Sequence, residues 1–279
     1  MDNPSGIGEI PDDLVLGNGH VHVWNLSLEP STVLRGRLAG VLSPVEQRRA
    51  ARFHFDRDRI RFIAARGLLR FILSLYLRLQ PEQIELIYGP YGKPALARRA
   101  NKNGFEFNLA HSDSLALVAV SRSGLVGVDV ERIHLPMDMN QLVECFFAPR
   151  EIQLFQKLPP HLKPLAFFNL WTRKEAWLKA TGEGIAHSLN RVEVSFLPGE
   201  TAQLLTLPTE VASIEQWSLH DLDVAPDFAG ALAIACHRPI ISYRRWNFSD
   251  GPQNSVTTSF ESLPDRFWRA QEFAATKAG

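Results

Sequence analysis

The stretch that decides the fold reads VGVDVE, from Val126 to Glu131. Apolar and acidic residues alternate in it, which predicts a half-buried β-strand, because successive side chains of a strand point to opposite faces. Asp129 and Glu131 should share one face, and Val128 and Val130 should point the other way into a core. Two carboxylates at this spacing lie roughly 6–7 Å apart. Their repulsion is about 2–3 kcal/mol at an effective dielectric constant of 20.

A divalent cation bound by oxygen ligands would turn this repulsion into attraction. Mg²⁺ prefers such a site, with substrate phosphates completing its coordination shell. A solvated edge strand would explain the same acidic pair, and for the pair taken alone this is the commoner explanation. Other parts of the chain must therefore decide between the two.

A second acidic element lies on a helix predicted from about Pro164 to Thr181 and ended by Gly182. Glu175 and Lys179 are four residues apart in it, so they share one face. As a surface ion pair they would contribute only a few tenths of a kcal/mol. If that face meets the acidic strand, Glu175 becomes a third carboxylate for one metal ion and Lys179 can reach a phosphate.

Helices and mostly antiparallel strands alternate in a pattern that occurs twice and splits near residues 121–124. This pattern predicts an α+β protein made of two similar α/β halves packed side by side. A cleft between such halves is a natural ligand site. The expected divisions are a flexible N-terminus over 1–20, an N-terminal half over 21–123, a C-terminal half with the metal site over 124–245, and an extension over 246–279.

Composition limits the cellular setting and the partners. Of the 279 residues, 45% are hydrophobic and the formal net charge is zero, so no overall field would attract nucleic acid. Cys145 and Cys236 lie far apart and outside any CxxC spacing, which favours a reducing compartment. Neither a signal peptide nor an uncharged apolar span is visible. We expect a soluble cytoplasmic protein that binds neither nucleic acid nor membrane.

Basic residues gather in the N-terminal half, where an anion site would need them. Lys93 follows Gly92 in a tight turn, which predicts an exposed side chain, and His111 follows a strand predicted over Phe105–Leu109. A solvated helix face would account for at least half of the arginines, and a backbone contact would equally account for His111. The arginines of the early helices are Arg49, Arg52, Arg57, Arg59, Arg61 and Arg66.

Four segments together resemble the surfactin-synthetase type of 4′-phosphopantetheinyl transferase. The resemblance spans roughly residues 40–240. It implies two similar α/β halves related by a pseudo-twofold axis, with coenzyme A in the cleft between them. The segments are Gly92-Lys93-Pro94, FNLAHS at 107–112, GVDVE at 127–131 and WTRKEAWLK at 171–179.

The resemblance also implies roles for single residues. Mg²⁺ would be held by Asp129, Glu131 and Glu175. Lys179 would lie near the transferred phosphate. The coenzyme A contacts implied are Arg49, Arg61, Lys93, His111, Lys174 and Lys179. The chain departs from the family pattern at Ala110, where a serine can supply a phosphate hydrogen bond, and at Phe62, where a hydroxyl residue can occur.

The implied reaction is phosphoryl transfer, in which positioning and charge neutralisation do most of the catalysis. The serine of an acyl or peptidyl carrier protein attacks coenzyme A, and adenosine 3′,5′-bisphosphate leaves. Glu175, directly or through a metal-bound water, would take the serine proton, and Lys179 would balance charge on the leaving phosphate. Since one chain already holds two similar halves, we expect a monomer.

Two other functions fit parts of the pattern. A non-catalytic homologue could bind coenzyme A or a carrier protein, but all three acids and Lys179 are present. A metal-dependent phosphodiesterase could use the same acids, but a net charge of zero argues against binding DNA.

Overall fold

The computed structural model describes residues 14–99, 101–135, 138–183, 189–208, 213–250 and 256–262. Residues 1–13 of the expected flexible N-terminus lie outside these ranges, and so do residues 251–255 and 263–279 of the expected C-terminal extension. The divisions expected after residues 20, 123 and 245 stay predictions.

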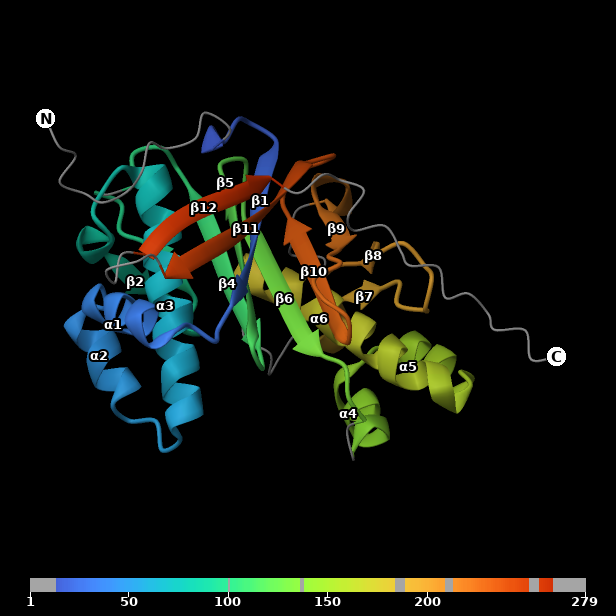
Figure 1. The fold of residues 1–279 in the computed structure, drawn as a ribbon. Helices are drawn as coiled ribbons and strands as arrows, with labels where there is room; N and C mark the ends of the chain where they lie inside the picture. The colour runs from blue at the N-terminus through green and yellow to red at the C-terminus, as the bar shows by residue number, and fades with distance from the viewer. Residues whose placement is uncertain are drawn as a thin grey trace, which may run out of the picture.

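A five-stranded sheet and a long helix form the first layer pair. The sheet has the order β12-β11-β1-β5-β4. Helix α3 (Asp56–Leu77) covers one of its faces, and α1 (Thr32–Gly40) and α2 (Pro44–Ala50) lie beside α3 (Figure 1). The strands are β1 (His20–Ser27), β4 (Glu106–Ser112), β5 (Leu115–Ser121), β11 (Ile240–Asp250) and β12 (Val256–Ser262).

The second layer pair repeats this arrangement with a smaller sheet of the order β6-β10-β9. Helix α6 (Lys163–Thr181) packs on β6 and β10, and α4 and α5 lie at its outer end (Figure 1). The strands of this sheet are β6 (Val126–Arg132), β9 (Ser218–Asp221) and β10 (Phe228–Ile234), and the short helices are α4 (Met139–Phe146) and α5 (Pro149–Gln156). Two hairpins complete the described fold: β2 (Leu86–Tyr88) with β3 (Pro94–Leu96), and β7 (Glu193–Val194) with β8 (Leu204–Thr206).

Local sequence signals explain where several elements begin and end. Helix α2 begins after a capping box in which the Ser43 hydroxyl accepts from the backbone N–H of Glu46, and the Glu46 carboxylate accepts from that of Ser43. Helix α6 ends at Gly182, whose φ of 79° lies in the left-handed region. Strand β9 begins at Ser218, directly after a 3₁₀ turn over Ile214–Gln216.

The two halves meet through a shared apolar core. Val128 and Val130 are fully buried in it, as the alternation of β6 predicts, and they pack with residues of β1, β4 and β5. The side chain of Asn108 also crosses this junction, because its Oδ1 accepts from the backbone N–H of Val128 at 2.9 Å. Each half therefore consists of a long helix on a mostly antiparallel sheet, and the predicted α+β class is confirmed.

The chain returns to the first sheet after completing the second. Strand β11 pairs in parallel with β1, from His20 opposite Ile240 to Asn25 opposite Arg245. Strand β11 runs across the boundary expected after residue 245. Among the described residues, no helix has the length and apolar character needed to cross a membrane.

Candidate active site

A close contact between β6 and α6 positions the acidic side chains. A Cβ atom on Gly127 would lie 2.1 Å from the carbonyl oxygen of Ala176 and 2.3 Å from the backbone nitrogen of Ala180. Only glycine allows the helix to approach the strand so closely. Residues 127, 129 and 131 share one face of the strand, so Asp129 and Glu131 also face α6.

Three carboxylates gather at this contact. Asp129 and Glu175 are buried, with 2% and 4% of their surface exposed, and Glu131 is half-buried. The structure therefore brings the acidic strand and the acid of the distant helix together. Asp129 Oδ2 and Glu175 Oε1 are buried and have no hydrogen-bond partner among the described residues. Buried carboxylate oxygens of this kind are costly unless a cation or a proton satisfies them.

The electrostatics of the cluster follow from the burial and closeness of its members. Burial, then Asp129 and Glu131, raises the pKa of Glu175 to about 7, against the lowering effect of Lys179. Burial and the neighbouring Asp129 also raise the pKa of Glu131, and burial raises that of Asp129. Like charges and desolvation both disfavour the ionised form, so the cluster carries more negative charge than its surroundings stabilise.

Lys179 supplies the positive charge nearest to the acids. Its Nζ lies 2.5 Å from Oδ1 of Asp129. Burial lowers the pKa of Lys179, but Asp129, Glu175 and Glu131 more than offset this and raise it above its ordinary value. One ammonium group cannot balance the charge of three ionised carboxylates, so a second cation of higher charge would also be stabilised here.

The donor set fits a hard divalent cation. All three groups offer carboxylate oxygens, which Mg²⁺ prefers, and two of these oxygens are buried and unpartnered. Within the described ranges, no three His, Cys, Asp or Glu side chains already stand in a metal-binding arrangement. The three carboxylates are therefore near one another without yet surrounding a common centre.

Positive groups gather beside the cluster around His111. Partial loss of water lowers the pKa of His111, and the charges of Lys179, Arg49 and Arg66 lower it further. The guanidinium carbon of Arg49 lies over the Phe62 ring, 5.4 Å from the ring centroid. The predicted phosphate contacts Arg49 and His111 therefore share one neighbourhood with Lys179. Such a concentration of positive charge favours an anion.

Arg61 is half-buried at the edge of this region. Its Nη2 lies 2.7 Å from Oδ1 of Asp113 and 3.5 Å from Oε1 of Glu29. Its Nε is buried without a partner among the described residues. The guanidinium is thus held by acids, and its predicted role toward coenzyme A stays a prediction.

Lys93 is placed differently from the sequence prediction. Its side chain is half-buried rather than exposed, and burial lowers its pKa. Its Nζ donates to the carbonyl oxygens of Ala180 at 2.7 Å and Val126 at 3.4 Å. The turn of the N-terminal half reaches the end of α6, so Lys93 joins the two halves. Its predicted contact with coenzyme A stays a prediction.

Lys174 has partners within the C-terminal half, and its predicted contact with coenzyme A stays a prediction. It is fully buried and pairs with the Glu151 carboxylate of α5, and it donates to the carbonyl oxygen of Leu189 at 2.7 Å. Lys174 precedes Glu175 by one residue, so the helical turn points the two side chains in different directions. Its contacts fasten α6 to α5.

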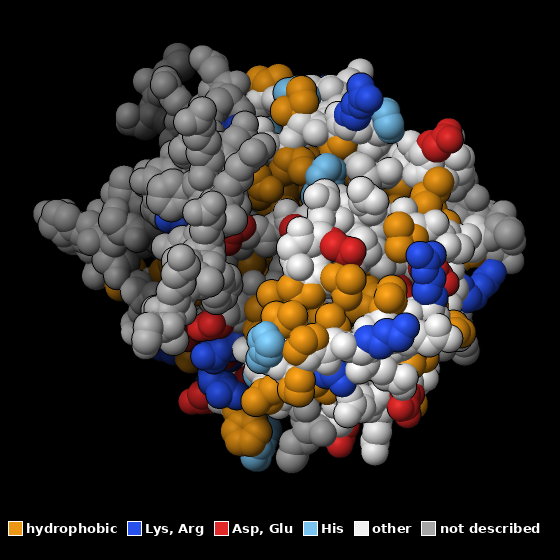
Figure 2. Space-filling model, turned by 90° about the vertical axis from the view of Figure 1, so that its right-hand side faces the viewer, with side chains coloured by type: hydrophobic (Ala, Val, Ile, Leu, Met, Phe, Trp, Pro, Cys, Tyr) orange, Lys and Arg blue, Asp and Glu red, His pale blue; other side chains and the backbone are white. Residues whose placement is uncertain are grey.

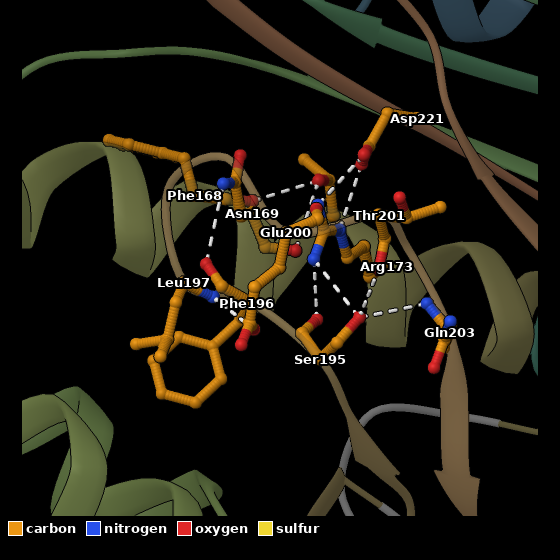
Figure 3. A network of polar contacts seen from close by, with 11 residues as sticks. Phe168, Asn169, Arg173, Ser195, Phe196, Leu197, Glu200, Thr201, Gln203 and Asp221 are labelled. Atoms are coloured by element: carbon orange, nitrogen blue, oxygen red, sulfur yellow. Dashed lines mark hydrogen bonds and ion pairs between the residues drawn. The ribbon is translucent and has the colours of Figure 1, made fainter.

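A second network fixes α6 on its outer side. The buried guanidinium of Arg173 binds both oxygens of Asp221 at 2.8 Å and the carbonyl oxygen of Ser195 at 2.6 Å (Figure 3). A pocket of about 390 Å³ lies nearby between α5 and the β7–β8 hairpin, and none of the three acids of the cluster lines it. Figure 2 shows the side of the molecule that lies on the right in Figure 1, where apolar side chains gather. Leu154 and Leu205 line the pocket and are exposed.

Sequence reasoning missed the part played by Asn108 and Ser112. Both point from β4 toward β6, where Asn108 binds the Val128 backbone and the Ser112 hydroxyl donates to Oε2 of Glu131 at 2.7 Å. The period of two in FNLAHS puts Asn108, Ala110 and Ser112 on one face. That signal was present, but only the fold reveals that this face meets the acidic strand.

These features define a protein in which two α/β halves enclose an acidic cluster with basic groups beside it. Residues 125–236 match the model of the 4′-phosphopantetheinyl transferase superfamily, and residues 29–123 match the model of the N-terminal part of 4′-phosphopantetheinyl transferases. The chain belongs to the 4′-phosphopantetheinyl transferase superfamily. Its assignment to the surfactin-synthetase type stays a prediction.

Three relatives illustrate this membership. The 4′-phosphopantetheinyl transferase HetI of Nostoc sp. is 41% identical over 81% of this chain and 92% of its own length. A putative 4′-phosphopantetheinyl transferase of Synechocystis sp. is 34% identical over 67% of this chain and 74% of its own length. A phosphopantetheinyl transferase of Thraustochytrium sp. is 31% identical, covering 81% and 84%.

Proposed function

We propose that this protein transfers the 4′-phosphopantetheine group of coenzyme A to a serine of an acyl or peptidyl carrier protein and releases adenosine 3′,5′-bisphosphate. The observation that carries the proposal is the convergence of Asp129, Glu131 and Glu175, from β6 and α6, beside Lys179. The membership of the superfamily and the names of the relatives support the same reaction.

Mg²⁺ is the proposed cofactor, and Asp129, Glu131 and Glu175 would hold it. When bound, the cation supplies charge neutralisation on the diphosphate of coenzyme A. The two unpartnered oxygens, Asp129 Oδ2 and Glu175 Oε1, support this assignment. The same three side chains repel one another without a cation, so a divalent ion also relieves an unfavourable arrangement.

Glu175 is the proposed acceptor of the serine proton. Glu175 lies in the cluster beside Asp129 and Lys179, and a carboxylate within reach of the serine hydroxyl can act as a general base. The serine oxygen forms a bond to the phosphorus nearest pantetheine as the bond to the bisphosphate oxygen breaks. The proton passes to Glu175, directly or through a water.

Lys179 and the basic groups around His111 are proposed to hold the charged parts of coenzyme A. Lys179 remains protonated, because its pKa is raised, and can accompany the negative charge that develops on the departing phosphate. Arg49 and His111 lie in the same positive neighbourhood and are proposed contacts for the nucleotide phosphates. Arg61 is proposed as a further contact.

The direct experiment mixes the protein, coenzyme A and Mg²⁺ with a panel of apo carrier proteins, and then measures the intact mass of each carrier. We expect a mass increase equal to one phosphopantetheine group on a serine, and none when the Mg²⁺ is replaced by EDTA. No increase on any carrier, with coenzyme A bound, would favour the non-catalytic homologue. Cleavage of plasmid DNA with Mg²⁺ would favour the phosphodiesterase.

Finer features of the function are proposals as well. We propose a cytoplasmic monomer with no nucleic-acid or membrane partner, on the grounds of the neutral net charge and of two similar halves in one chain. Sedimentation of the purified protein, alone and with a carrier, measures its oligomeric state.

A further inference from the structure

The turn between β4 and β5 reaches from the N-terminal half to the end of the acidic strand. Ser112, the last residue of β4, donates its hydroxyl hydrogen to Oε2 of Glu131 at 2.7 Å. The backbone N–H of Arg132 donates to the same hydroxyl oxygen at 3.2 Å. One hydroxyl group therefore contacts two consecutive residues of β6.

The chemistry of the two partners fixes the direction of both contacts, because an ionised carboxylate can only accept. An amide N–H can only donate, so the hydroxyl oxygen of Ser112 must accept from Arg132. The single hydroxyl hydrogen is then available for Glu131, and a bond to a charged carboxylate is stronger than one between neutral groups. The carboxylate is held through Oε2. Among the described residues, no hydrogen bond to its other oxygen, Oε1, is found.

Neighbouring ion pairs hold this turn in place. The Asp113 carboxylate pairs at 2.7 Å with Arg61 of α3 through one oxygen and at 2.7 Å with Arg132 through the other. Asp113 thus joins the two halves directly beside Ser112. Arg132 is exposed, so its ion pair contributes little by itself. The less exposed Arg61 gives the turn its firmer attachment.

We propose that Ser112 is a positioning residue, which orients the Glu131 carboxylate so that its second oxygen is presented to the divalent cation. This inference rests on the proposed function, because it assumes that Glu131 is a metal ligand. Partners that orient a ligating carboxylate typically change metal affinity by 10–100-fold when removed. Ser112 comes from the other half of the molecule, so the metal site requires both halves to be correctly docked.

The test measures metal binding separately from catalysis. Free Mn²⁺ is followed by electron paramagnetic resonance in the presence of coenzyme A and without a carrier. The variants are Ser112→Ala, Ser112→Thr, which keeps the hydroxyl, and Ser114→Ala as the matched control from the same turn. Thermal unfolding in EDTA accompanies each titration, because a purely structural role would lower the melting temperature without changing the Mn²⁺ affinity of the folded protein.

We expect Ser112→Ala to weaken Mn²⁺ binding by roughly 10–100-fold, while Ser112→Thr and Ser114→Ala stay near the wild-type affinity. Wild-type affinity in folded Ser112→Ala overturns the inference, and so does a Ser112→Thr variant as weak as Ser112→Ala. If Ser112→Ala leaves Mn²⁺ binding unchanged while the wild type modifies carriers, the inference fails and the proposed function stands. If the wild type binds Mn²⁺ but modifies no carrier, the proposed function fails, and the Ser112→Ala comparison still decides the inference.

Discussion

Nζ of Lys179 lies 2.5 Å from Oδ1 of Asp129, while Oδ2 of the same carboxylate is buried without a partner among the described residues. One oxygen of Asp129 is thus satisfied by a side chain of α6, and the other remains available to a ligand. The ion pair joins the strand β6 to the helix α6.

Replacing Asp129 by asparagine is expected to remove activity and to keep the fold. The substitution preserves the side-chain volume and removes one of three mutually repelling charges. We expect the rate of carrier modification to fall by more than about 100-fold. Removing a residue that only orients a metal ligand typically costs up to about 100-fold, and Asp129 is itself a proposed ligand. Circular dichroism checks the fold, and Asp56→Asn, at an exposed carboxylate of α3, is the matched control. Near-normal turnover in Asp129→Asn would remove the metal assignment.

Gly127→Ala tests whether the close approach of β6 and α6 builds the site. The new Cβ would lie 2.1 Å from the Ala176 carbonyl oxygen, so the helix must move away from the strand. We expect a lower melting temperature and weaker Mn²⁺ binding, because Glu175 moves away from Asp129. Gly36→Ala in α1 is the control, since its Cβ would meet no atom within 4 Å. A stable Gly127→Ala variant with normal metal affinity would contradict this account of the site.

The two lysines show where sequence reasoning stopped. Lys93 and Lys174 both lie in recognisable motifs, but each motif fixes a residue type and not the direction of its side chain. Lys93 donates a hydrogen bond to the carbonyl oxygen of Ala180 at the end of α6, and Lys174 forms an ion pair with the buried carboxylate of Glu151. Both partners are distant in sequence, so no local pattern points to them.

The acidic cluster was predictable because each of its parts is local. Alternation alone places Asp129 and Glu131 on one face, and the four-residue spacing places Glu175 and Lys179 on another. Strand β11 was not predictable in the same way. It contains Arg244 and Arg245 and pairs in parallel with β1, far away in the chain, so its pattern is weak and its partner is non-local.

Lys93→Met separates a structural role from a role in binding coenzyme A. The variant loses the hydrogen bonds to the carbonyl oxygens of Ala180 and Val126. Leaving such groups unsatisfied costs about 1–3 kcal/mol, so we expect lower stability with little change in the KM for coenzyme A. Urea unfolding and steady-state kinetics measure both quantities, with the exposed Lys102→Met as control. A large rise in the KM for coenzyme A at unchanged stability would instead support the predicted contact of Lys93 with coenzyme A.

The raised pKa of Glu175 predicts a pH dependence of stability in the absence of metal. The folded protein keeps a proton on Glu175 up to about pH 7, whereas the unfolded chain loses it near the ordinary value of 4.5. The folded state therefore binds more protons between these values, and the stability contributed by this group falls as the pH rises through that window.

Glu175→Gln mimics the protonated side chain, so this part of the pH dependence should disappear. In EDTA, we expect the melting temperature of the wild type to fall more steeply than that of Glu175→Gln from about pH 4.5 to 7. Exposed Glu82→Gln is the control and should follow the wild type. Parallel curves for the wild type and Glu175→Gln would show that Glu175 titrates normally.

The most direct measurement locates the cation itself. Crystals grown with coenzyme A and Mn²⁺, which scatters anomalously, give the metal position independently of any activity. We predict one anomalous peak at the junction of β6 and α6, at about 2.1 Å from carboxylate oxygens of Asp129, Glu131 and Glu175, a distance typical of small divalent ions. A peak elsewhere, or coenzyme A bound with no metal among these three acids, would contradict the account.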